Sequence, residues 1–179
     1  MKLRWIQAGL GMMAVQLATF SAQADELNIM IPRVPASQIA MAKTMKPPFS
    51  VTPEVIAKGK KLYDGAGTCF TCHGTDGKGK VDEAMGLNPS PPDLSSYTFD
   101  QIRTAGEMMW VVSNGSPLQP AMVGFVSLGQ ITESQAWEAV FYVRSFGCKG
   151  DMDCIVGLLD WVARQGIQQK VSSLGEEQP

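Results

Sequence analysis

The sequence predicts an all-α domain, for three reasons. Apolar residues recur at helical spacing in several segments, the firmest of which begin at Thr52 and Thr132. These segments open with residues that cap helices well, and glycines stand where the helices are expected to end. No stretch alternates apolar and polar residues convincingly over the length of a strand. With 45% hydrophobic and 18% charged residues in 179, the chain can bury an ordinary globular core.

The N-terminus is predicted to be a signal peptide, residues 1–24. Lys2 and Arg4 form a short basic start, and an uncharged and largely apolar stretch of 16 residues follows. The sequence Ser-Ala-Gln-Ala at positions 21–24 then places small residues where a signal peptidase reads them. The apolar stretch is shorter than the roughly 20 residues that a membrane helix needs. We therefore expect an exported mature chain, residues 25–179, without a transmembrane segment. An uncleaved N-terminal anchor is the alternative.

The next segment, residues 25–50, contains four prolines and is predicted to form a mostly extended N-terminal arm, with one helical turn within residues 37–46. The first firm helix follows Thr52, because threonine caps helices well and Pro53 suits the first helical position. Its apolar face is formed by Val55, Ile56, Gly59, Leu62 and Tyr63.

Two irregular segments follow this helix. Residues 65–80 are rich in glycine and are predicted to be a loop whose backbone can approach a large rigid object closely. Residues 88–93 contain three prolines and can be neither helix nor central strand. Three further helices are predicted. The first runs through residues 99–113, opens at Ser96 or Thr98 and stops at Asn114-Gly115. The second follows the capping box Thr132–Gln135 and ends at Gly147, and the third covers residues 151–164.

The glycine-rich loop contains Cys69-Phe70-Thr71-Cys72-His73, a C-x-x-C-H pattern typical of covalent c-type haem attachment. Two thiols at this spacing can form thioethers with the two vinyl groups on one edge of a porphyrin, and the adjacent histidine then lies beneath the iron. His73 is the only histidine, so two histidine ligands within one chain are excluded. The pattern predicts one covalent haem c, with Cys69 and Cys72 as thioethers and His73 as an axial ligand.

Other interpretations of this cysteine pair stay open at this point. A four-thiolate zinc site would have to recruit Cys148 and Cys154, whose spacing is unlike that of zinc ribbons. A thioredoxin-like C-x-x-C would need a βαβ context, which the pattern of the chain does not show. A chance match is the third alternative.

Four segments resemble class I cytochromes c. They are CFTCHG at residues 69–74, NPSPPDL at 88–94, NGSPLQPAMVGF at 114–125 and WEAVFYVRSF at 137–146. With the first helix they cover about residues 52–147, in the order found in that family. The resemblance implies a class I cytochrome c fold, in which an N-terminal and a C-terminal helix pack crosswise around one haem. Gly59 and Tyr63 look like the contact positions of the first helix, and Tyr142 like the aromatic residue that meets them.

The resemblance also implies that Met122 is the second axial ligand of the haem iron. The chain length supports this independently, because Met122 follows His73 by 49 residues and can travel around the haem, whereas Met85 follows it by only 12. We interpret Met108 and Met109, in the middle of a predicted helix, as core residues. The resemblance further suggests that the Pro92 carbonyl accepts the ring N–H of His73. Three aromatic residues are candidate walls of the haem pocket: Trp110, Phe125 and Tyr97.

The remaining cysteines, Cys148 and Cys154, are expected to form a disulfide, because unassigned cysteines in an oxidising compartment commonly pair. The predicted organisation is therefore a signal peptide (1–24), an N-terminal arm (25–50), a cytochrome c domain (51–147) and a disulfide-tethered helical extension with a polar tail (148–179).

These features predict an electron-transfer protein. If both axial positions of the iron are filled, substrates cannot easily reach it, so we expect single-electron transfer rather than catalysis. The leading hypothesis is a periplasmic shuttle between redox partner proteins. A haem subunit docked on a larger membrane or periplasmic oxidoreductase or respiratory complex is the second, which the arm and the extension favour. A ligand-binding or catalytic haem protein is the third, if Met122 does not bind the iron. The mildly acidic chain has no feature of a nucleic-acid partner.

Overall fold

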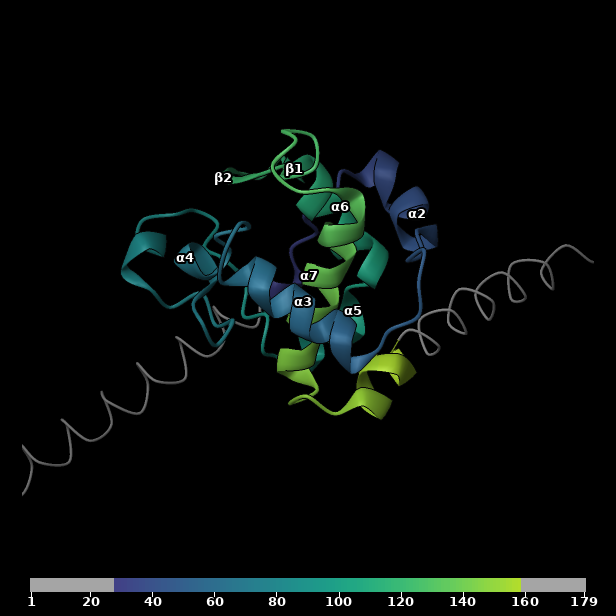
Figure 1. Ribbon diagram of the computed structural model, residues 1–179. Coiled ribbons are helices and arrows are strands. Elements are labelled where there is room, and N and C mark those ends of the chain that lie inside the picture. The colour runs from purple at the N-terminus through teal and green to yellow at the C-terminus, as the bar shows by residue number, and fades with distance from the viewer. Residues whose placement is uncertain (1–27, 159–179) are drawn as a thin grey trace, which may run out of the picture.

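The computed structural model describes residues 28–158, which form a mainly helical domain (Figure 1). The predicted signal peptide and the chain beyond residue 158 lie outside the described residues. The elements are α2 (Ala36–Thr44), α3 (Pro53–Tyr63), α4 (Phe70–His73), the 3-10 turn η1 (Asp82–Ala84), α5 (Tyr97–Ile102), α6 (Ala105–Asn114), β1 (Gly115–Ser116), β2 (Gln119–Val123) and α7 (Glu133–Gly147). The all-α class is confirmed, although the small antiparallel β1–β2 sheet was not expected.

The packing of α3 against α7 forms the centre of the domain. A Cβ atom on Gly59 would lie 2.7 Å from the Glu138 carbonyl carbon and 2.8 Å from the Tyr142 Cβ, so only glycine allows this close approach. One turn later on α3, the ring of Tyr63 meets that of Tyr142 edge to face, with centroids 5.3 Å apart. The helix contact that the resemblance implied is confirmed at all three residues.

The helix predicted over residues 99–113 is divided in two, and this part of the prediction is wrong. Arg103 and Thr104 are extended and separate α5 from α6. The Thr104 hydroxyl accepts a hydrogen bond from the Glu107 N–H at 3.0 Å, and the Glu107 carboxylate accepts one from the Thr104 N–H at 2.9 Å. This buried capping box satisfies the first N–H groups of α6, which explains why a new helix starts here.

The N-terminal arm is more helical than predicted, and it packs on the rest of the domain. Its α2 is a nine-residue helix instead of a single turn. Gly106 at the start of α6 faces α2, where an added Cβ would lie 3.1 Å from the carbonyl oxygen of Met45. Ala42 of α2 is fully buried. The arm therefore lies along the domain and covers α6.

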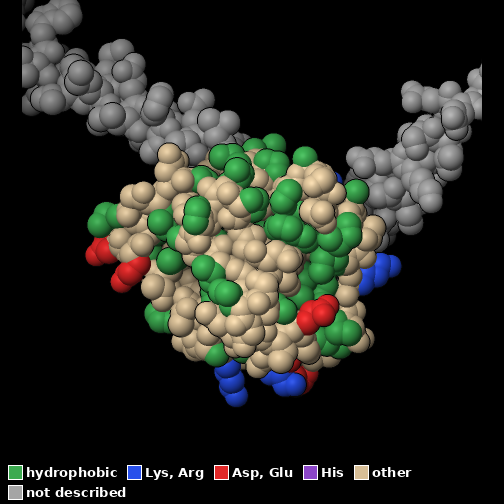
Figure 2. Space-filling model, turned by 90° about the horizontal axis from the view of Figure 1, so that it is seen from above, with side chains coloured by type: hydrophobic (Ala, Val, Ile, Leu, Met, Phe, Trp, Pro, Cys, Tyr) green, Lys and Arg blue, Asp and Glu red, His purple; other side chains and the backbone are tan. Residues whose placement is uncertain are grey.

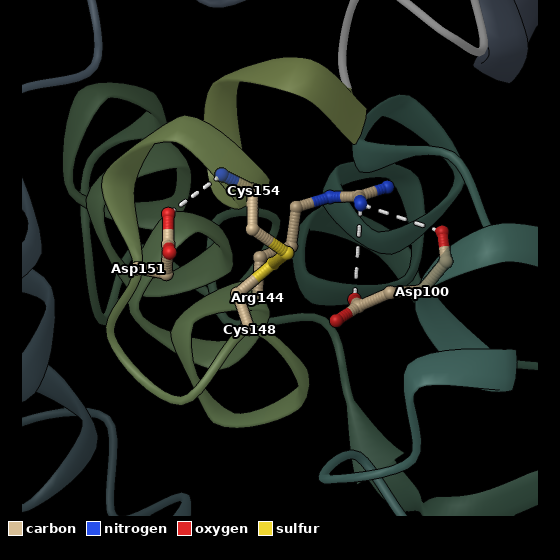
Figure 3. Close-up of a disulfide and its surroundings, with 5 residues drawn as sticks. All are labelled: Asp100, Arg144, Cys148, Asp151 and Cys154. Atoms are coloured by element: carbon tan, nitrogen blue, oxygen red, sulfur yellow. Dashed lines mark hydrogen bonds and ion pairs between the residues drawn. A yellow bond between two sulfur atoms is a disulfide. The ribbon is translucent and has the colours of Figure 1, made fainter.

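The C-terminal part of the structure agrees with the sequence prediction. The Thr132–Gln135 capping box opens α7, which ends at Gly147. Cys148 and Cys154 form a disulfide (Figure 3). A helix follows over residues 152–158. Its buried side chains, Ile155 and Leu158, pack with partly buried Val51 and Ile56.

A buried ion pair joins α7 to α5. Arg144 and Asp100 are both 0% exposed, and Arg144 Nη1 lies 3.7 Å from Asp100 Oδ1 (Figure 3). Arg144 also donates hydrogen bonds to the carbonyls of Asp100 at 3.4 Å and Arg103 at 2.6 Å. Burial raises the pKa of Asp100 to about 7, against the opposing effect of the Arg144 charge.

Among the described residues, no helix is both long and apolar enough to cross a bilayer.

Candidate cofactor site

The C-x-x-C-H segment begins the site, and it is a helical turn rather than the plain loop expected. The His73 N–H donates to the Cys69 carbonyl at 2.9 Å, which closes the turn. Residues three apart on a helix lie on one face, so the turn brings Cys69 and Cys72 to the same side. The Cys69 N–H donates to the Tyr63 carbonyl at 3.1 Å, which attaches the turn to the end of α3.

A cavity of about 370 Å³ lies beside this turn, and Cys69, Cys72 and His73 all line it. Its volume falls within the range of roughly 300–1,000 Å³ found for ligand and cofactor pockets. Most of its lining is apolar and comes from elements far apart in the sequence, including Leu94, Phe99, Val112, Ile131, Val140 and Val143. The fold therefore places an apolar chamber next to the haem-attachment pattern.

The His73 imidazole is suited to binding a metal. Burial lowers its pKa to about 4, and the positive charge of Arg33 adds to this effect. The ring is therefore neutral near pH 7, as a metal-binding histidine must be. Its Nδ1 atom is buried and has no hydrogen-bond partner. The predicted hydrogen bond to the Pro92 carbonyl is thus not formed, although Pro92 lines the cavity.

Met122 lines the same cavity from β2. Its strand is held in place at two points. Gly115 of β1 pairs with Val123, and the Gln119 side-chain amide donates to the Pro89 carbonyl at 2.8 Å. The prolines around residue 120 therefore belong to a short hairpin that carries Met122 to the cavity wall.

The other methionines are placed differently. Met85 is 74% exposed and Met109 is fully buried, and neither is among the cavity-lining residues. Met108 is a buried core residue as predicted, but it also lines the cavity. The structure thus brings two thioethers, those of Met122 and Met108, to the cavity that contains His73.

The predicted aromatic walls are only partly present. Phe125 lines the cavity, whereas Trp110 and Tyr97 do not. The face of α6 that meets the cavity carries Glu107, Met108, Val111 and Val112. At about 100° per residue, Trp110 lies on another face of that helix. Tyr97 is at the surface, 50% exposed.

Several polar residues at the cavity were missed by the sequence analysis, among them Asn28, Arg33 and Arg103. Arg33 and Asn28 belong to the arm, and Arg103 lies in the break between α5 and α6. The one available signal was an arginine within the apolar and proline-rich segment of residues 29–35. Only the docking of the arm shows that this arginine belongs to the site.

These residues fit a c-type haem. Two thiols, a neutral imidazole and thioether side chains line one apolar cavity. Gly67, which also lines it, has no room for a side chain, since an added Cβ would lie 3.0 Å from the Cys69 sulfur. A zinc site with Cys148 and Cys154 does not fit, because those sulfurs are joined to each other. The part of the chain that the structure describes contains no cluster of three or more His, Cys, Asp or Glu side chains that could hold a metal ion by themselves.

The surface beside the hairpin is nearly free of charge. Seen from the hairpin end, the molecule presents apolar and uncharged polar side chains, with charged ones mainly near the margin (Figure 2). Leu118 and Val123 of the hairpin are exposed. This face offers a contact surface with few charges, close to the hairpin that carries Met122.

Comparison with known proteins identifies the family. No curated protein matches the chain. The family described as cytochrome c matches residues 56–147, just over half of the chain, and this segment contains the attachment pattern, the hairpin and α7. The chain therefore belongs to the cytochrome c family, whose members transfer electrons through haem.

Proposed function

We propose that the protein is a periplasmic carrier of single electrons with one haem c, attached through Cys69 and Cys72 and ligated by His73 and Met122. The observation that carries this proposal is that one cavity collects both thiols, the imidazole and the Met122 thioether. A bound haem supplies an iron that alternates between the ferric and ferrous states. The remaining properties of the site come from the side chains of this chain.

These side chains favour the reduced state and exclude other chemistry. A thioether is a soft, uncharged ligand, so Met122 raises the reduction potential relative to a second nitrogen ligand. The apolar walls keep water away and disfavour the additional positive charge of ferric iron. If both His73 and Met122 bound the haem iron, no position on the iron would stay open to a substrate, which favours electron transfer over catalysis.

The proposed compartment follows from the sequence and the disulfide. Residues 1–24 have the pattern of a cleavable export signal. A disulfide between Cys148 and Cys154 suits an oxidising compartment such as the bacterial periplasm.

Between a shuttle and a docked subunit, the internal packing favours the shuttle. The arm packs on α6, and the C-terminal helix packs beside α3 through Ile155 and Leu158. The described parts of the two extensions, residues 28–50 and 148–158, thus pack within the domain. Gel filtration of the native protein tests this choice. A shuttle elutes as a free small protein, whereas a subunit elutes with its complex.

Absorption spectra of the purified mature protein in both oxidation states test the proposal. We expect c-type haem bands in the reduced state, a weak sulfur-to-iron charge-transfer band in the oxidised state, and haem that stays on the chain after denaturation. A colourless protein would contradict the proposal. Rapid carbon monoxide binding by the reduced form, without the sulfur band, would instead favour a ligand-binding or catalytic protein.

A further inference from the structure

Two arginines line the cavity, and one of them comes from outside the family match. Arg33 lies on the N-terminal arm, before residues 56–147, and Arg103 lies just before α6. Arg103 donates hydrogen bonds to the carbonyls of Ile29 at 3.0 Å and Met30 at 2.7 Å. The same side chain therefore reaches the cavity and binds the arm that carries Arg33.

Among the described residues, the hydrogen-bond partners of Arg33 are neutral groups. Its Nη2 atom donates to the Asn28 side-chain oxygen at 2.6 Å and to the Ser90 carbonyl at 3.3 Å. Asn28 in turn donates to the carbonyls of Ser90 at 3.2 Å and Pro91 at 3.3 Å. The Nε atom of Arg33 is buried and has no hydrogen-bond partner within residues 28–158. The guanidinium is positioned by these bonds, but its charge is not balanced by them.

The charges around the cavity do not cancel. Within the described chain, no carboxylate forms an ion pair with Arg33, and Arg103 lies 3.9 Å from the Glu107 carboxylate. Burial lowers the pKa of Arg33, and the like charge of nearby Arg103 lowers it further. The charged side chains that line the cavity are thus Arg33, Arg103 and Glu107, and His73, Cys69 and Cys72 line it as well. An unbalanced cation beside an apolar cavity is costly unless an anion joins it.

We propose that Arg33, with Arg103 beside it, binds the propionate carboxylates of the haem, so that the N-terminal arm is part of the cofactor site. This inference rests on the proposed function, because a haem must occupy the cavity. The propionates are the anionic groups that a haem brings, and the guanidinium fork matches a carboxylate with two parallel hydrogen bonds. The bonds to Asn28 and Ser90 involve only Nη2 of Arg33, so the guanidinium keeps further N–H donors for a carboxylate.

The proposal has two measurable consequences. A cation beside a carboxyl group lowers the pKa of that group. A cation near the iron also disfavours the ferric state and raises the reduction potential. The potential of the wild-type protein should therefore change with pH through a carboxyl group whose pKa is held down by Arg33.

Redox titration of the full mature holoprotein over a range of pH tests the inference. In a plot of midpoint potential against pH, the curve bends at the pKa of the titrating carboxyl group, and we call this pH the inflection. We expect Arg33→Gln to lower the midpoint potential and to raise the inflection by at least about half a pH unit. The matched control is Lys46→Gln, which removes an exposed charge from the same arm, at a residue that does not line the cavity, and should change neither quantity. Asn28→Asp places a carboxylate against Arg33 with little change in shape and should shift the inflection in the same direction.

An Arg33→Gln holoprotein with the potential and inflection of Lys46→Gln would overturn the inference. If the Arg33→Gln protein does not accumulate, the Asn28→Asp holoprotein serves as the test. An inflection in Asn28→Asp at the wild-type pH would then overturn the inference. Glu107 is the carboxylate among the cavity-lining residues, so Glu107→Gln tests whether it causes the pH dependence. The potential of this variant should still change with pH. If the inflection disappears, the titrating group is Glu107 and the inference fails. Wild-type protein without a covalent haem spectrum would defeat the proposed function itself. A normal spectrum with unresponsive variants defeats only the role of Arg33.

Discussion

The hydroxyl group of Tyr63 donates a buried hydrogen bond of 2.7 Å to the carbonyl oxygen of Gly74. Tyr63 ends α3 and packs against aromatic rings of α7, while Gly74 directly follows His73. One side chain therefore connects the central helix contact to the turn that carries the proposed iron ligand. Because that turn is short, such external attachments determine where it lies.

Loss of this hydrogen bond should destabilise the fold. Tyr63→Phe leaves the Gly74 carbonyl without its buried donor, and we expect the unfolding free energy to fall by about 1–3 kcal/mol. Denaturant unfolding of the holoprotein measures the change. Tyr97→Phe is the control, since that ring is 50% exposed, and it should unfold like the wild type. Equal stability of the two variants would contradict the structural role of Tyr63.

The α3–α7 contact should not tolerate a side chain at residue 59. In Gly59→Ala the new methyl group would meet the backbone of Glu138, and we expect a loss of about 1–3 kcal/mol or more. Gly157→Ala is the matched control, because no atom lies within 4 Å of its added Cβ. That change should be neutral or stabilise the C-terminal helix by up to about 1 kcal/mol. Thermal unfolding of both variants distinguishes a specific clash from a general effect of alanine.

The choice between the two cavity methionines can be decided by substitution. Met122→Leu removes the proposed ligand, so the charge-transfer band should disappear, the potential should fall and the reduced form should bind carbon monoxide. Met108→Leu keeps an apolar side chain of similar volume in the core, and it should retain the band at a stability cost below about 1.5 kcal/mol. Loss of the band only in Met108→Leu would reverse the assignment.

The disulfide should stabilise the domain without affecting the haem. Its cysteines are separated by 6 positions, and closure of so small a loop is worth about 2 kcal/mol. We expect the double variant Cys148→Ala and Cys154→Ala to lose roughly this amount. Hydrogen exchange should show the helix over residues 152–158 opening more often. The absorption spectrum provides the internal control and should not change.

The buried Asp100 should make stability depend on pH. Its pKa is raised by burial from 3.8 to about 7, so between about pH 4 and pH 7 the folded protein holds a proton that the unfolded chain has released. The free energy of unfolding should therefore fall as the pH rises through this window.

Asp100→Asn tests that dependence, because the amide cannot ionise. We expect the variant to lose the part of the pH slope that Asp100 causes between pH 4 and pH 7, as measured by denaturant unfolding at a series of pH values. Asp82→Asn, at an exposed position on η1, should keep the wild-type slope. An unchanged slope in Asp100→Asn would show that Asp100 is ionised throughout this window.

The local features of the fold could be predicted from the sequence because short-range chemistry determines them. Thr52 caps α3 and the Thr132–Gln135 box opens α7 through hydrogen bonds to residues three positions away. The C-x-x-C-H pattern is equally local, since its spacing alone places two thiols on one face of a turn. Where two local signals competed, the prediction was wrong. The capping box at Thr104 ended a helix that apolar periodicity had predicted to continue.

The composition of the site depends on contacts that no short segment contains. The sequence by itself identified the thiols, His73 and Met122 as candidate haem contacts. Only the tertiary structure brought them to one cavity, added Met108 to it and turned Trp110 away. Arg33 belongs to the cavity because its arm is hydrogen-bonded to Ser90 and Arg103, residues 57 or more positions away. Bonds over such separations form only when the whole chain has folded, and neither spacing nor composition encodes them visibly.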